Sequence, residues 1–260
     1  MTAEAVAERL TERFANGRFE SRLDRAGLLV HNFDSLDKTT TRKIWETCGQ
    51  HEWCKDVNDR VSASIVSAAL PYHFTDDQGG VILSPSRVHV LCSYPGDGGT
   101  IHLKCHPPGF SSTCTPGCFD KQGRSWWCKN DGSWRPGMDH HRCPWRPENL
   151  DQMLRQQADD ITTGRRQKET SCGQPSGCSY NEVVLSPFTP DAIEAVFYPV
   201  GADRDAEDKA WRVHEEVSNA IIETQSPPLL AFDLKEGRFW TVCRYRLHLQ
   251  RVDVTRCRDQ

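Results

Sequence analysis

The sequence lacks the features that define several large classes of protein. Its 32 basic and 36 acidic residues give a net charge of −4, so it has no positive excess of the kind that nucleic-acid-binding proteins show. Its longest small or apolar stretch, residues 63–70, is interrupted by serines and is too short to span a bilayer. Leu, Ile, Val and Phe are few, 52 of 260 residues, but the low net charge argues against disorder. We therefore expect a soluble globular protein with one large domain or two small ones.

Sequence motifs of well-known catalytic sites are also absent. There is no G-x-x-x-x-G-K-[ST] or G-x-G-x-x-G sequence for phosphates, and residues 173–177 (Gly-Gln-Pro-Ser-Gly) miss the G-x-S-x-G pattern by one position. Residues 214–218 begin like the zinc-binding H-E-x-x-H motif but end in serine. We therefore predict no cofactor and no metal, and whether the protein is an enzyme stays open.

Targeting signals are missing from the N-terminus. The chain begins Met-Thr-Ala-Glu-Ala, without the basic and apolar regions of a secretory signal peptide, and it contains no N-x-[ST] glycosylation site. Either a targeting segment has been removed, which is the interpretation we favour, or the protein stays in a reducing compartment.

Cysteine is what the sequence has in abundance. Eight of the twelve cysteines fall within residues 92–178, where only 7 of 87 residues are Leu, Ile, Val or Phe, against 45 of 173 elsewhere. So few apolar side chains cannot offset the chain entropy by burial, which predicts that covalent bonds stabilise this region. An even number of irregularly spaced cysteines is typical of a disulfide framework, with up to six bridges, in a secreted or lumenal protein. The cysteines are Cys48, Cys54, Cys92, Cys105, Cys114, Cys118, Cys128, Cys143, Cys172, Cys178, Cys243 and Cys257.

Zinc binding is the alternative use of these cysteines. No C-x-x-C pair occurs, although paired ligands of this kind are typical of structural zinc sites. Cys114, Cys118 and Cys128, followed by His140-His141 and Cys143, are the one group of residues that could assemble Cys and His ligands. The absence of paired spacing favours disulfides.

Hydrophobic periodicity predicts a mixture of helices and strands. Apolar residues four apart predict helices, as in residues 3–15, and short apolar runs bounded by Gly, Pro or Asn predict strands. The predicted helices are residues 3–15, 56–70, a helix beginning at Pro147, and 205–223. The predicted strands are residues 26–31, 80–83, 88–92, 183–185, 193–198, 229–234, 239–242 and 245–252, with a hairpin turn at 95–99.

Four tryptophans lie in the cysteine-rich region, where few aliphatic side chains are available to pack against them. Exposed aromatic rings beside planar polar groups suit the binding of sugars, and the neighbouring sequence supplies Asp139 and His140. The alternative is that the indole rings cover the disulfides in a small local core. The tryptophans are Trp126, Trp127, Trp134 and Trp145.

Two glutamates are placed in or beside apolar strands. Glu182 enters the strand at 183–185, and Glu194 lies within the strand at 193–198. A carboxylate in such a position is an ion-pair partner or a functional group with a raised pKa. If both act in glycoside chemistry, their carboxyl groups should lie about 5–10 Å apart. The alternative is that strand alternation directs Glu194 into solvent.

Residues 181–185 and 190–196 resemble the glutamate-bearing strand pair of the ADP-ribosyltransferase fold. The resemblance implies an NAD-dependent enzyme in which Glu182 binds the nicotinamide ribose, and His31 matches the histidine of the family's first strand. It covers about twenty residues. Tyr180 stands where the arginine-modifying members have Glu or Gln, which puts that specificity in doubt.

These features predict an α+β fold with one main mixed or antiparallel sheet, packed helices and a disulfide-rich, loop-dominated insertion. We divide the chain into a first core part (1–91), a cysteine- and tryptophan-rich region (92–178) and a second core part (179–260). The predicted function is to bind, and if it is an enzyme to modify, an extracellular or lumenal ligand such as a glycan. An NAD-dependent transferase and a structural component without a site are the alternatives; protein partners stay unknown.

Overall fold

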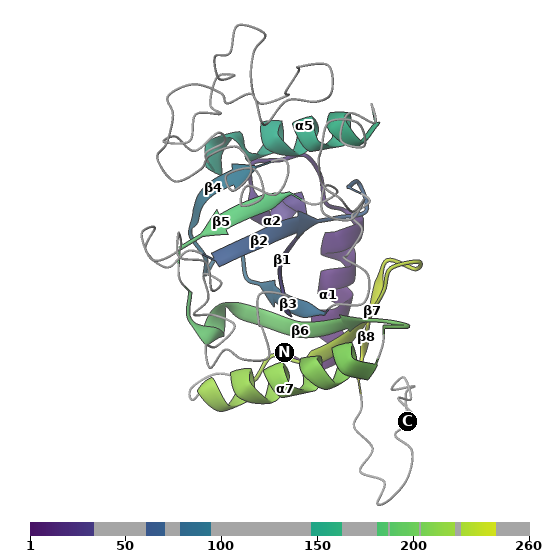
Figure 1. Ribbon diagram of the computed structural model, residues 1–260. Coiled ribbons are helices and arrows are strands. Elements are labelled where there is room, and N and C mark those ends of the chain that lie inside the picture. The colour runs from purple at the N-terminus through teal and green to yellow at the C-terminus, as the bar shows by residue number, and fades with distance from the viewer. Residues whose placement is uncertain are drawn as a thin grey trace, which may run out of the picture.

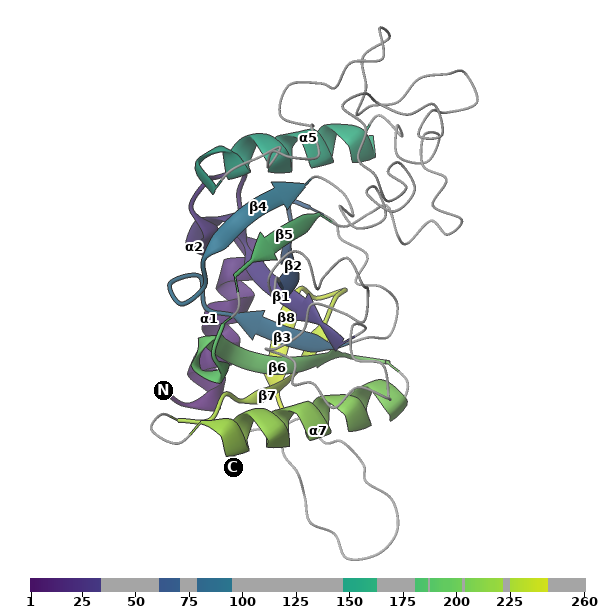
Figure 2. The same cartoon turned by 60° about the vertical axis from the view of Figure 1, so that its left-hand side comes forward.

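The computed structural model of the chain describes residues 1–33, 61–70, 79–94, 147–162, 181–186, 188–202, 204–221 and 225–242 (Figure 1). These residues form an α+β fold, as the sequence predicts, in which helices pack on both faces of one mixed sheet (Figures 1 and 2). Within them, no helix is both long and apolar enough to cross a membrane.

Eight strands of the described chain make the sheet, in the order β4-β5-β2-β1-β3-β6-β7-β8. Neighbouring strands are antiparallel except β6 and β7, which are parallel because helix α7 connects them as a crossover. The strands are β1 (Leu28–Asn32), β2 (Val61–Val66), β3 (Gly80–Leu83), β4 (Val90–Tyr94), β5 (Glu182–Leu185), β6 (Ile193–Pro199), β7 (Leu229–Asp233) and β8 (Arg238–Thr241).

Helices begin and end where local sequence signals place them. The Thr2 hydroxyl caps α1 by accepting a hydrogen bond from the Ala5 amide, and the helix ends before Asn16. The short helix η3 (Pro147–Asn149) leads into α5, which confirms the helix predicted to begin at Pro147. The α-helices are α1 (Ala3–Ala15), α2 (Leu23–Ala26), α5 (Leu150–Thr162) and α7 (Arg204–Ala220), and η5 (Pro190–Ala192) is a second short helix.

The two faces of the sheet carry separate hydrophobic cores. On one face, which we call the α1 face, Leu10 and Phe14 of α1 pack with strand residues such as Val30 and Phe232. On the other, the α5–α7 face, α5 lies beside β4 at one end and α7 beside β6 and β7 at the other (Figures 1 and 2). Strand residues therefore alternate between two buried environments rather than between core and solvent.

One predicted element is wrong. The sequence predicts a helix over residues 56–70, but residues 61–66 form β2, which pairs with β1 and β5. The apolar spacing of Val61 and Ile65 fits both periodicities, because residues four apart share a face in a strand as well as in a helix. Strands with both faces covered carry apolar residues on both faces, and this run is rich in β-branched side chains.

The other predicted strands and helices within the described residues are confirmed, with shifts of up to three residues at their ends. The strand expected at 88–92 is β4, residues 90–94. The predicted turn at 95–99 and strand at 245–252 lie outside the described residues. β4 and α5, which fall largely within the region 92–178, pack into the same core as the first and last parts of the chain.

Candidate functional site

Two strands that border the cysteine-rich segments lie side by side at one corner of the fold: β4, after which residues 95–146 begin, and β5, before which residues 163–180 end. Residues 95–146 follow Tyr94 at the end of β4 and return at η3, which packs beside β4. Residues 163–180 follow α5 and return at β5, where Glu182 lies opposite Tyr94 in the sheet. These two segments carry seven of the twelve cysteines and all four of the tryptophans singled out above.

Buried polar residues gather at the same corner. Seven polar or charged residues of the described chain are buried, and five of them lie on β2, β4, β5 or α5 close to this corner. Burying polar groups lowers stability unless they form hydrogen bonds, so a cluster of buried polar residues is expected to be joined by hydrogen bonds. The five are Ser64, Ser93, Gln157, Asn181 and Glu182.

Asn181 is the centre of this group. Its side-chain Oδ1 accepts a hydrogen bond from the Ile65 amide at 2.7 Å, and its Nδ2 donates to the Ile65 carbonyl at 2.8 Å. The same Nδ2 donates to Oε1 of Gln157 on α5 at 2.8 Å. The Ser64 hydroxyl donates to the Asn181 carbonyl at 2.7 Å. Asn181 therefore joins β2, the start of β5 and α5 through hydrogen bonds removed from water.

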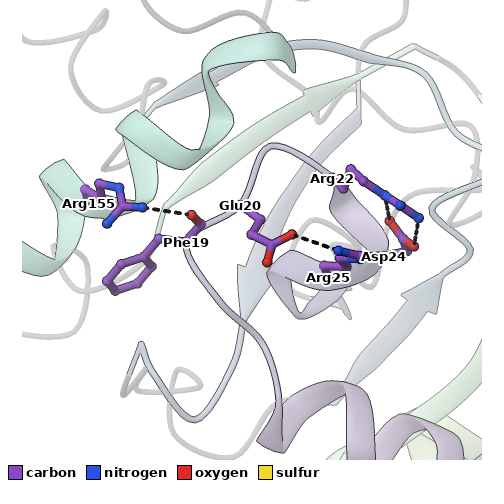
Figure 3. Close-up of polar contacts among 6 residues, drawn as sticks. All are labelled: Phe19, Glu20, Arg22, Asp24, Arg25 and Arg155. Atoms are coloured by element: carbon purple, nitrogen blue, oxygen red, sulfur yellow. Dashed lines mark hydrogen bonds and ion pairs between the residues drawn. The ribbon is translucent and has the colours of Figure 1, made fainter.

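On its outer side, α5 contacts the connection between α1 and β1 (Figure 3). Arg155 donates to the backbone carbonyl of Phe19 at 3.4 Å. Its guanidinium carbon lies 5.8 Å from the centre of the Phe19 ring. The Ser21 hydroxyl donates to the Asp151 carboxylate at 2.7 Å. These contacts are exposed or half-buried, in contrast to the buried contact between Asn181 and Gln157.

Glu182 is the predicted site residue that belongs to this corner. It is 8% exposed and directly follows Asn181. Because Val183 and Leu185 belong to the α5–α7 face, alternation along β5 directs the Glu182 side chain to the α1 face. A carboxylate is thus almost buried two residues beyond the end of the segment 163–180.

Glu194 lies elsewhere, in an ion pair. Its Oε2 is 2.8 Å from Nη1 of Arg13 and its Oε1 is 3.7 Å from Nη2 of Arg9, both arginines belonging to α1. Burial lowers the pKa of Arg13, and the neighbouring Glu194 carboxylate opposes that shift. The expectation that alternation directs Glu194 into solvent is wrong, since its side chain is only 12% exposed.

The two glutamates do not form a catalytic pair. β5 and β6 are separated in the sheet by β2, β1 and β3, which places Glu182 and Glu194 four strand spacings apart. At about 4.8 Å per spacing their backbones are roughly 19 Å apart, too far for the separation of 5–10 Å that glycoside hydrolysis requires. The predicted arrangement of Glu182 and Glu194 as an acid–base pair is therefore wrong.

His31 is buried on β1, with 3% of its surface exposed. It shares the α5–α7 face with Leu29 and Phe33, whereas Glu182 is directed to the α1 face. A site in which His31 and Glu182 act on one bound molecule needs both side chains on one face of the sheet. The structure separates them, so the arrangement implied by the resemblance to ADP-ribosyltransferases is not present.

The remaining predicted site residues lie outside the described residues. They are Trp126, Trp127, Trp134, Trp145, Asp139 and His140, together with the possible zinc ligands. In the ranges that the structure describes, no group of three or more His, Cys, Asp or Glu side chains is arranged to hold a metal ion.

Asn181 and Gln157 are functional candidates that the sequence alone does not reveal. The available signal was an asparagine directly before an apolar strand and at the end of a cysteine-rich segment, but turns have the same signal. Only the pairing of β2 with β5 shows that the Asn181 side chain is buried.

Compared with known proteins, the chain matches no family model and no curated protein.

Proposed function

We propose that this protein is an extracytoplasmic, disulfide-stabilised binding protein whose ligand is a glycan. The observation that carries the proposal is the corner of the fold where the segment 95–146 begins and the segment 163–180 ends, beside the paired residues Tyr94 and Glu182. In this proposal the sheet and helices are the scaffold, and the segments 95–146 and 163–180 supply the ligand contacts. Binding residues commonly lie on loops held by a rigid scaffold, which supports this division of roles.

The residue types in these segments favour a sugar ligand. Indole rings provide flat apolar surfaces, and the polar Asp139 and His140 can hydrogen-bond to hydroxyl groups beside them. Glu182, almost buried at the same corner, is the carboxylate that we assign to the border of the site. Since Glu194 is held by Arg13, a hydrolase with two paired carboxylates is not part of the proposal.

The test is a binding screen of the full, oxidised chain on an array of immobilised oligosaccharides. Replacing Trp126, Trp127, Trp134 or Trp145 singly by Ala should abolish binding for at least two of the four. The loss of stability should stay well below the ~3–5 kcal/mol of emptying a core site. Trp240→Ala is the matched control, because β8 lies at the opposite end of the sheet from β4.

The outcomes separate the proposed function from its alternatives. Binding that survives in all four variants, or is lost equally in Trp240→Ala, contradicts the proposal. Consumption of NAD by the wild type, lost in Glu182→Gln, would instead support the transferase. If the wild type neither binds a glycan nor consumes NAD, the remaining alternative is a structural component without a ligand site.

A further inference from the structure

The Asn181 side chain extends the sheet beyond its backbone pairing. A carboxamide carries the same donor and acceptor as a peptide group, and Asn181 uses both on the amide and carbonyl of Ile65. The backbone register of β2 and β5 runs from the pair Val61 and Leu185 to the pair Ala63 and Val183. The side chain thus continues the ladder past the end of that register.

The remaining donor of this carboxamide binds a different element. Nδ2 donates to Gln157, and both side chains have no exposed surface. Gln157 lies on the same side of α5 as Met153 and Leu154, which are buried in the core. One buried side chain therefore holds α5 against the sheet at the point where the chain enters β5.

We propose that Asn181 is a positioning residue that fixes α5, and with it the ends of the segments 95–146 and 163–180, relative to β5. The proposal deepens the proposed function and rests on it in one respect: fixing these ends reduces the ordering that glycan binding requires. Such preorganisation raises affinity without any direct contact to the ligand.

The first experiment compares variants by hydrogen exchange of the full oxidised chain. Gln157→Met removes the acceptor on α5 but keeps the bonds between Asn181 and Ile65. Protection of the amides in 150–162 should fall about tenfold, because one buried donor loses its partner, whereas β6 and β7 should keep theirs. Ser21→Ala is the control, since it removes a half-buried hydrogen bond to the same helix; protection of α5 should stay within about twofold.

A second measurement needs no variant and applies even if Gln157→Met does not fold. In the wild type, the Ile65 amide that donates to Asn181 should exchange through the same opening as the amides of α5. Their exchange rates should respond equally to low concentrations of denaturant. Exchange of the Ile65 amide only with the global unfolding of β6 and β7, while α5 opens separately, would overturn the proposal.

The oligosaccharide array separates failure of this inference from failure of the proposed function. Gln157→Met should bind about tenfold more weakly than the wild type, and Ser21→Ala should bind equally well. A uniform loss of protection throughout the sheet, or unchanged binding despite a loosened α5, would overturn the positioning role. If the wild type binds no oligosaccharide, the proposed function is wrong, and the exchange data still decide whether Asn181 fixes α5.

Discussion

Nη1 of Arg13 lies 2.8 Å from Oε2 of Glu194, and this ion pair joins α1 to the middle of the sheet. The pairing of β3 with β6 shifts between Ile82 and Leu83, which leaves Glu194 as the extra residue of a bulge. A bulge redirects a side chain relative to the regular alternation. Glu194 is thereby directed to the face covered by α1, and both side chains of the pair are largely buried.

Glu194→Gln should lower the free energy of unfolding by about 3 kcal/mol, because it leaves the buried Arg13 guanidinium without a counter-charge. Urea denaturation of both proteins measures the difference. The control is Asp191→Asn, which removes the exposed pair with Arg87 and should lower stability by less than about 1 kcal/mol. Equal effects of the two variants would contradict the structural importance of the Arg13 pair.

Gly27→Ala should destabilise the protein more than Gly201→Ala. Both glycines have a positive φ, but a Cβ at Gly27 would lie 2.5 Å from the Val66 carbonyl oxygen, and at Gly201 it would meet nothing within 4 Å. We expect a loss of at least about 2 kcal/mol at Gly27 and about 1 kcal/mol at Gly201. Thermal unfolding of the two variants measures this order, and the reverse order would contradict the packing of β1 against β2.

His214 should make the protein less stable in mild acid. Burial lowers its pKa below the ordinary 6.5, although the imidazole donates to the Pro227 carbonyl and has Glu215 nearby. As the pH falls through about 6.5 the unfolded chain takes up this proton first, so stability declines until the pH lies below the folded pKa.

His214→Gln tests this assignment, because glutamine keeps a donor for the Pro227 carbonyl but does not titrate. The urea midpoint of the variant, relative to the wild type, should rise when the pH is changed from 7.5 to 5. If the urea midpoints of the two proteins differ by the same amount at both pH values, His214 does not contribute to the loss of stability in acid.

All twelve cysteines should be oxidised in the native protein. Each disulfide takes up two hydrogens on reduction, so the intact mass should increase by about 12 Da if six are present. Intact-mass spectrometry before and after treatment with a thiol reductant measures this. An unchanged mass together with bound zinc would contradict both the disulfide framework and the proposed compartment.

Much of the fold could be predicted from the sequence because its elements carry local signals. Thr2 and the stripe of Val6, Leu10 and Phe14 define α1 without reference to any other part of the chain. The same is true of α7, whose inward side chains recur at helical spacing. The α+β class followed from these elements and the short apolar runs between them.

The candidate site could be predicted only in part. The position of Glu182 at the start of an apolar strand marks it as a candidate, and its side chain is almost buried. Its separation from Glu194 depends on the order of the strands, and the face on which His31 lies relative to Glu182 depends on pairing. Neither the strand order nor the pairing of the strands can be read from the local sequence around these residues.

Tertiary pairing decided what local patterns left open. Residues 61–66 satisfy two periodicities, and only their position between β1 and β5 makes them a strand. Asn181 has the local sequence signal of a turn, and only the proximity of β2 and α5 gives its amide three buried hydrogen bonds. The sequence by itself determined the long helices α1 and α7 and most of the apolar strands, because their signals depend on neighbours in the chain. The ion pair of Arg13 and the clustering at Asn181 arise from residues brought together across the sheet, whose contacts are fixed by strand order and register.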